Sequence, residues 1–185
     1  MAKIVYSMLT SLDGYIAGSD GNIALPVPEA ELHQHFNDMM RQASVVLAGR
    51  RMYETMRFWD SPDRETGATE VERDFAGAWR ETPKIVFSTT LRQVGPNARL
   101  ASGDALTTVK SLKTQTDGLV ILGGADLAAF LARAGLIDEY RLYMHPVVLG
   151  DGKPYFQSGL SLTLKPLGTE SLAQGVTLLR YAPAG

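Results

Sequence analysis

Apolar residues follow two patterns along the chain, and the change between them divides the sequence into two parts. Before residue 139, short apolar runs are each followed by a segment with helical spacing; the runs are residues 3–10, 44–48, 84–88 and 119–122. Such strands are typical of a parallel sheet whose two faces are covered by helices. Beyond residue 139, residues 140–148 alternate in character, and residues 160–164 and 176–181 also resemble strands. This second part predicts an antiparallel tail.

The segments between the apolar runs have the spacing of amphipathic helices, at residues 28–42, 50–58, 70–80, 104–116 and 126–134. In the first, Leu32, Phe36 and Met40 recur on one helical face. Pro28 suits the first turn of this helix, where its missing N–H is not needed. Asp104 is a typical N-cap. The polar residues 61–69, with a proline and a glycine, predict a surface loop.

These elements predict an α/β fold with a central, mostly parallel sheet flanked by helices and an antiparallel C-terminal hairpin. A length of 185 residues fits one domain, so residues 1–185 are expected to form a single domain. The composition, 45% hydrophobic and 21% charged, is ordinary for a globular chain.

Charge and cysteine content exclude several classes of protein. Eighteen basic against 20 acidic residues give a net charge of −2, so no broad nucleic-acid or anionic-membrane surface is expected. With no cysteine, the chain cannot form disulfides, a cysteine-ligated zinc site or a cysteine nucleophile. His33 and His35 are two residues apart on a helix and point to different faces, so no metal site is expected. Neither a signal peptide nor a membrane span is recognisable, so a cytoplasmic location is expected.

Candidate chemistry gathers after three of the predicted parallel strands, in turns that begin at Gly49, Ser88 and Gly123. Parallel strands bring these turns to one edge of the sheet, where open α/β sheets bind ligands. Glycines, helix N-termini, arginines and hydroxyls together suit an anionic dinucleotide. Each turn alone could equally be a simple cap or a solvated surface. The patterns G-x-G-x-x-G, P-loop and G-x-S-x-G are absent.

Five ordered segments resemble the dihydrofolate reductase-like family: SLDGYIA (11–17), GRRMYE (49–54), GG-x-x-L (123–127), GLIDE (135–139) and PVVLGDG (146–152). The nearest branch is the reductase (C-terminal) domain of the bifunctional riboflavin-biosynthesis deaminase/reductase, and the resemblance runs from Lys3 to Tyr181. The zinc-deaminase pattern cannot exist without cysteine, so a stand-alone reductase-like chain is expected.

The resemblance implies NADPH as hydride donor, often a homodimer, and specific roles for the turns. Gly49 and Arg50, with Arg51 as a further candidate, match the turn that meets the 2′-phosphate, and Ser88 and Thr89 match hydroxyls beside it. The glycine turn matches the one that lies against the pyrophosphate and nicotinamide side of the cofactor. It comprises Gly123, Gly124 and Ala125, and Leu127 ends its motif. Leu12, Asp13 and Gly14 match a loop near the nicotinamide and substrate. The Gly123–Gly124 peptide bond is expected to be cis.

The activity expected from this resemblance is hydride transfer from NADPH to a C=N or C=O carbon of a small heterocyclic or sugar-like substrate. The nearest named reaction is reduction of 5-amino-6-(5-phosphoribosylamino)uracil, and dihydrofolate or pterin reduction is the second choice. A non-catalytic, dimeric nucleotide-binding module is the alternative from another class.

The source of the proton is open between Asp13, Glu31 and water. Glu31 lies near the position of the acidic residue on the first helix of dihydrofolate reductases, but Glu29 and Asp38 compete with it. Glu31 could equally be a solvated helix-face carboxylate, and Asp13 a turn-forming residue before Gly14.

Aromatic residues surround the expected cleft, and Tyr53 and Trp59 are candidates to stack on a flat substrate ring. The simpler interpretation of these residues is core and rim packing. A homodimer is also expected from the C-terminal strands. There, Tyr143 and His145, or Leu179 and Tyr181, would otherwise place apolar area in water. The alternative is that the helix 70–80 covers this face.

Overall fold

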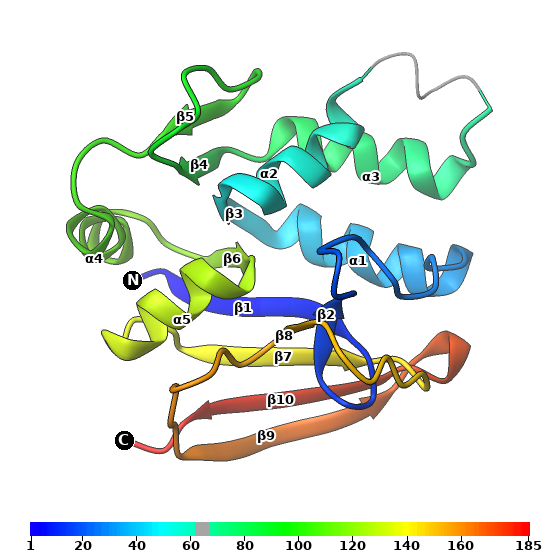
Figure 1. Ribbon diagram of the computed structural model, residues 1–185. Helices are drawn as coiled ribbons and strands as arrows, with labels where there is room; N and C mark the ends of the chain where they lie inside the picture. Colours follow the sequence, from blue (N-terminus) through cyan, green and yellow to red (C-terminus); the bar gives the residue numbers. More distant parts are fainter. Residues whose placement is uncertain (62–66) are drawn as a thin grey trace.

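A single eight-stranded sheet runs through the protein in the order β5-β4-β3-β6-β1-β7-β10-β9 (Figure 1). The computed structural model describes residues 1–61 and 67–185, so part of the loop predicted at 61–69 lies outside the described residues. The strands of this sheet are β1 Lys3–Thr10, β3 Ala43–Gly49, β4 Lys84–Phe87, β5 Ala98–Leu100, β6 Leu119–Gly123, β7 Glu139–Met144, β9 Leu164–Ser171 and β10 Thr177–Pro183. β2 (Tyr15–Ala17) and β8 (Lys153–Pro154) form a separate two-stranded sheet.

Most of the large sheet is parallel, as predicted. β1 pairs in parallel with β6 and β7, so that Tyr6 lies between Leu122 and Tyr140. β3 pairs in parallel with β6 and β4, and β4 with β5. Only the C-terminal β10 and β9 run antiparallel, β10 to β7 and β9 to β10. The predicted antiparallel hairpin is therefore the β9–β10 pair.

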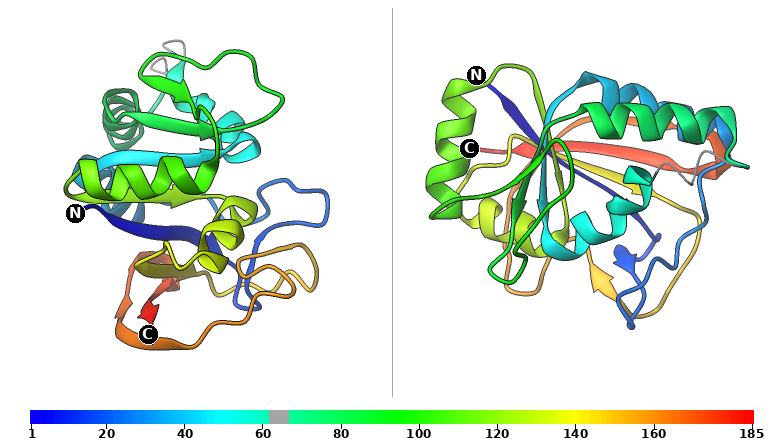
Figure 2. Two further views of the ribbon diagram at one scale, coloured as in Figure 1. Left: turned by 90° about the vertical axis from the view of Figure 1, so that its left-hand side faces the viewer. Right: turned by 90° about the horizontal axis from the view of Figure 1, so that it is seen from above.

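Helices cover both faces of the sheet (Figure 2). They are α1 Ala30–Gln42, α2 Arg50–Met56, α3 Glu70–Glu81, α4 Ala105–Gln115 and α5 Ala125–Arg133, with short 3-10 turns η1 Arg57–Asp60 and η3 Ala173–Gly175. The main core, which includes Tyr6, Leu47 and Leu122, packs against α4 and α5. On the other face Val46 and Ile121 pack against α1 and α3. Among the described residues no helix has the length and apolar character that crossing a membrane requires.

Several elements differ from the sequence-based expectation. The α1 helix begins at Ala30 with Glu29 as its N-cap, so Pro28 precedes the helix instead of opening it. The strand expected at 160–164 lies instead at Leu164–Ser171, an edge strand that is almost wholly exposed. Its lysine, proline and glycine are the residues that edge strands carry, and they hide the alternating pattern. β5 and β8 are too short to leave a periodic pattern at all.

The α1 helix also covers a face that we expected to be exposed. Tyr143 and His145 are each only 1% exposed. The ring of Phe36 lies 4.9 Å from that of Tyr143, and His35 Nε2 lies 3.1 Å from the Tyr143 hydroxyl. The expectation that Tyr143 and His145 present apolar area to water is therefore wrong: α1, and not the helix at 70–80, packs on Tyr143, and His145 is buried as well.

A buried carboxylate joins three strands at the start of β7. Glu139 is fully buried and accepts hydrogen bonds from Lys3 Nζ (2.5 Å), Arg141 Nε (2.7 Å) and Arg180 Nε (2.8 Å). These cations come from β1, β7 and β10. Burial alone would raise the pKa of Glu139, but the hydrogen bonds from Arg180, Arg141 and Lys3 outweigh it and lower the pKa to about 2. The charge cluster thus fastens the antiparallel tail to the parallel sheet.

We predict that Glu139→Gln destabilises the protein by roughly 3 kcal/mol, because it leaves three neighbouring cations without their anion. This is the low end for a broken buried pair, since Lys3 and Arg180 remain partly exposed and screened. Urea unfolding measures the change. Glu81→Gln, at an exposed position, is the matched control and should change stability by less than about 0.5 kcal/mol.

The pH dependence has a defined sign. Because the folded pKa of Glu139, about 2, lies below its ordinary value of 4.5, its stabilisation is complete above pH 4.5 and is lost as the pH falls toward 2. The difference in unfolding free energy between wild type and Glu139→Gln should shrink over this range. A difference that stays constant from neutral pH to pH 2 contradicts the assignment.

Candidate functional site

The carboxyl ends of β4, β3 and β6 lie side by side, as the sequence predicted. The parallel registers pair Gly49 with Phe87 and Ala48 with Gly123. The turn after each strand therefore opens at the same sheet edge, where α2 begins at Arg50 and α5 at Ala125 (Figure 1). This edge combines two helix N-termini, glycines and exposed hydroxyls, which is a suitable setting for an anionic ligand.

Arg50 connects two of these turns. Its Nη1 donates to the Thr90 hydroxyl at 3.0 Å, and its Nε lies 3.7 Å from the Glu54 carboxylate. The Ser88 hydroxyl accepts from the backbone N–H groups of Thr90 (3.2 Å) and Leu91 (3.0 Å). Arg50 thus contacts Thr90, which was not among the binding candidates. The only signal for Thr90 in the sequence was its place beside Ser88 and Thr89 in one polar turn.

Arg51 points to another part of the site. Its Nη1 would lie 3.7 Å from a Cβ placed on Gly21, so its guanidinium lies against the loop that follows β2. Successive residues on a helix are turned by about 100°, which separates the two arginines. Arg50 alone therefore faces the polar turn at Ser88–Thr90.

The glycine turn between β6 and α5 is tightly built. Gly124 has a φ of +97°, which favours glycine, and its carbonyl accepts the Ala128 N–H at 3.1 Å. A Cβ on Gly123 would lie 3.1 Å from Met52 Cγ, so this glycine lets α2 pack against the turn. The described residues contain no cis peptide bond, so the expectation of a cis bond at Gly123–Gly124 is wrong. The chain turns through the positive φ of Gly124 instead.

Two candidates that flank this turn are core residues. Ala125 is 2% and Leu127 9% exposed, and both lie on the buried face of α5. Leu127 belongs to the main hydrophobic core, and its Cβ would lie 4.0 Å from a Cβ on Gly49. The Leu127 side chain therefore supports the close approach of α5 to the Gly49 turn.

The loop after β1 carries Leu12, Asp13 and Gly14. Leu12 is 58% exposed. Both Asp13 oxygens accept backbone N–H groups, Oδ1 from Leu149 at 3.1 Å and Oδ2 from Gly150 at 2.8 Å. A hydrogen bond from the Ser11 side chain, and then these two amides, lower the pKa of Asp13 against a smaller opposing effect of desolvation. These contacts favour the ionised form of the carboxylate, which accepts a hydrogen bond at each oxygen.

The other proton-donor candidate lies in a different layer. Glu31 is exposed in the first turn of α1, on the face of the sheet opposite α5 (Figure 2). The polar groups that α1 buries are instead His33 and Asn37, joined by a 2.9 Å contact between Nδ1 and Oδ1. A buried histidine and asparagine four residues apart leave no pattern that distinguishes them from solvated helix positions.

The two aromatic candidates are held by packing. Tyr53 is 1% exposed, and its hydroxyl accepts the Gly95 N–H at 2.7 Å, so no ring face is open to a substrate. Trp59 is half-buried, with its ring 4.9 Å from Phe75 and 5.7 Å from His33. It joins η1 to the layer formed by α1 and α3.

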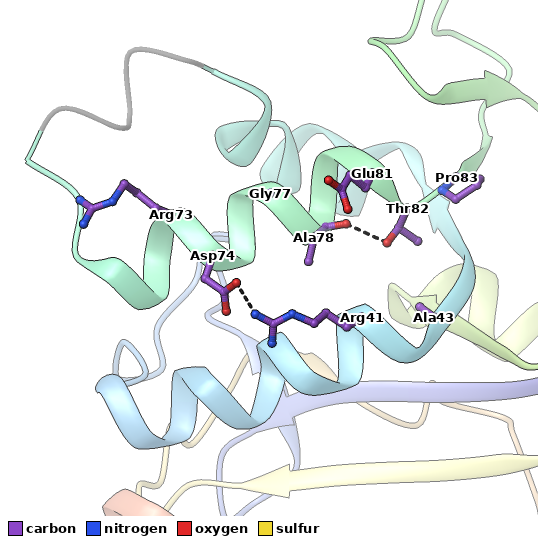
Figure 3. A pocket seen from close by; sticks show the side chains of 9 residues that line it. All are labelled: Arg41, Ala43, Arg73, Asp74, Gly77, Ala78, Glu81, Thr82 and Pro83. Carbon is purple, nitrogen blue, oxygen red and sulfur yellow. Dashed lines mark hydrogen bonds and ion pairs between the residues drawn. The ribbon is translucent and has the colours of Figure 1, made fainter.

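A groove of about 640 Å³ lies between the end of α1 and α3 (Figure 3). Its lining includes Arg41, Arg73, Asp74 and Glu81, and Arg41 is paired with Asp74. The groove is on the α1 and α3 face, and its residues include none of the strand-end turns. The groove mixes basic and acidic side chains, and one of its arginines, Arg41, is already paired with Asp74, so the sheet edge remains the candidate functional site.

Comparisons with known proteins identify the family and the fold. Residues 2–178 match the family described as RibD C-terminal domain. A protein from Shewanella sp. PV-4 assigned to riboflavin biosynthesis has a similar structure (TM-score 0.76, 23% identity, 100% of both chains covered). The chain also resembles the Thermotoga maritima diaminohydroxyphosphoribosylaminopyrimidine deaminase/5-amino-6-(5-phosphoribosylamino)uracil reductase (TM-score 0.69, 16% identity, 99% of this chain and 57% of that one). Dihydrofolate reductase from Enterococcus faecalis, complexed with NADP(H), has a TM-score of 0.65 at 12% identity, over 99% of this chain and 97% of that one. The fold is dihydrofolate reductase-like.

Proposed function

The chain belongs to the RibD C-terminal domain family, and from this premise we propose that it is an NADPH-dependent reductase. The substrate class is a small heterocyclic or ribosylamino compound, with 5-amino-6-(5-phosphoribosylamino)uracil as the nearest named candidate. That reductase activity is part of the name of the Thermotoga maritima protein, and NADP(H) is bound by the Enterococcus faecalis one. The observation that carries the proposal is the contact of Arg50 with the polar turn at Ser88–Thr90, on the same sheet edge as the glycine turn.

The residues of this edge fit the cofactor. The exposed Arg50 guanidinium would pair with the 2′-phosphate, and the hydroxyls of Ser88, Thr89 and Thr90 would share it. Gly124, the N-cap of α5, has no side chain to occupy the free N–H groups of the helix, so they would face the pyrophosphate. When bound, NADPH supplies the hydride, and the chain orients it and excludes water.

A direct assay tests the activity. The protein is mixed with NADPH and a panel of ribosylaminopyrimidines and pterins, and oxidation is followed by the loss of absorbance at the reduced-nicotinamide band. We expect turnover with a ribosylaminopyrimidine. Turnover with dihydrofolate instead would identify the second enzymatic candidate.

A non-catalytic nucleotide-binding module is the second candidate function. Two observations favour it: Asp13 accepts two backbone N–H groups, and Glu31 is a residue of α1, which packs on the face of the sheet opposite α5. If neither carboxyl group supplies a proton, water would have to do so in an enzyme. NADPH binding without oxidation of any panel member supports this module.

We predict that Arg50→Ala weakens NADPH binding by roughly 10–100-fold, because a charge-assisted contact contributes about 1.5–3 kcal/mol. NADH binding should hardly change, since NADH lacks the 2′-phosphate. Titration of the NADPH fluorescence measures both. Arg51→Ala is the matched control, and because its guanidinium lies against the loop at Gly21, it should leave the ratio of the two affinities unchanged. Equal losses of both cofactors in Arg50→Ala contradict the assignment.

We also propose that the protein forms a homodimer. Tyr143 and His145 no longer support it, but Leu179 and Tyr181 are only half-buried, and the edge strand β9 exposes Leu167 by 43%. Pairing through this end of the sheet would cover both the side chains and the edge. Light scattering at micromolar concentration should give twice the 20.1 kDa chain mass. A mass near 20.1 kDa overturns the dimer.

A further inference from the structure

Two loops that are distant in sequence are joined at the carboxyl ends of β1 and β7. The first follows β1 and spans residues 11–17, and the second follows β7 and spans residues 146–155. Their backbones meet where Leu12 N–H donates to the Val147 carbonyl at 2.7 Å. Asp13 adds the side-chain connection, since its two oxygens accept the N–H groups of Leu149 and Gly150 at 3.1 and 2.8 Å. No other carboxylate among the described residues hydrogen-bonds across these two loops.

Beyond Asp13 the same loops continue as the β2–β8 pair. The fit is close: a Cβ on Gly152 would lie 2.1 Å from the Ala17 carbonyl oxygen, so only glycine permits this approach. Tyr155 N–H donates to the Gly14 carbonyl at 2.9 Å, and the Tyr155 ring is buried against Tyr6 of β1. The pair is thus anchored to the sheet at its far end.

The second loop is also tied to the glycine turn. Lys153 Nζ lies 2.6 Å from both oxygens of Asp126, in the first turn of α5. Movement of residues 146–153 would therefore disturb both the β1 loop and the start of α5. The proposed function places the start of α5 against the pyrophosphate, and the family resemblance implies that the β1 loop lies near the nicotinamide.

We propose that Asp13 is a positioning residue, which clamps the 146–152 loop onto the 11–14 loop and so shapes the nicotinamide end of the site, instead of donating a proton. The carboxylate has the right form for this role, because an anion accepts two N–H groups at once and has no hydrogen of its own to donate. The adjacent Leu12 and Gly14 take their places from this clamp. The effect on the cofactor rests on the proposed function, whereas the clamp itself does not.

The test compares wild type with Asp13→Ala, Asp13→Asn and the control Asp20→Ala in the full chain. Asp20 is also an exposed carboxylate of the segment that follows β1, but it accepts only from Asn22 N and Nδ2, both at 2.9 Å. Amide hydrogen exchange of residues 146–152 should accelerate about tenfold in Asp13→Ala and remain unchanged in Asp20→Ala. Exchange in β6 should be unchanged in every variant, which shows that the fold is intact.

The cofactor gives a second readout. Asp13→Ala should weaken NADPH and NADH equally, by about three- to tenfold, unlike the selective loss expected for Arg50→Ala. Asp13→Asn should fall between wild type and alanine, because its amide oxygen can still accept one N–H. With a substrate from the panel, the pH profile of Asp13→Asn above about pH 5 should parallel that of wild type, where Asp13 is already ionised.

Unchanged exchange at 146–152 in Asp13→Ala overturns the proposal. So does an equal loss of turnover in the asparagine and alanine variants with exchange and cofactor binding intact, which is the behaviour of a proton donor. If wild type binds neither NADPH nor NADH, the proposed function fails, and hydrogen exchange still decides whether Asp13 clamps the loops.

Discussion

The structure depends on the position of β1 at the centre of a parallel arrangement, paired with β6 on one side and β7 on the other. Because parallel strands end at the same edge, the turns after β3, β4 and β6 and the loops after β1 and β7 gather at one end of the molecule. The strand order alone therefore brings the candidate binding groups together at that end. The sheet that stabilises the protein also assembles the site.

Charge and apolar packing hold different parts of this sheet. In the middle, buried aliphatic and aromatic side chains pack against helices on both faces. At the start of β7, the antiparallel tail is fastened by Glu139 and its three cations, which are directional contacts. Such contacts tie β10 to β7 and, through Lys3, to β1 on the far side of β7, although they contribute less net stability than their number implies.

At the site, too, the direction in which a side chain points decides its contacts more than its position in the sequence does. Arg50 and Arg51 are neighbours, yet helical geometry sends one to the polar turn at Ser88–Thr90 and the other toward Gly21. Asp13, by contrast, meets groups more than 130 residues away because two strand ends bring their loops together.

The sequence by itself determined the α/β class, the parallel strands, most helices and the three strand-end turns, because apolar periodicity and glycine are local signals. It could not decide between a catalytic and a turn-forming Asp13, or show that Tyr53 is buried, because both depend on contacts with Leu149, Gly150 and Gly95 far along the chain. The bounds of β9 were also beyond it, since an exposed edge strand has no buried face to impose alternation. Only the tertiary structure brings such residues together, because hydrogen bonds between distant loops have no period in the sequence.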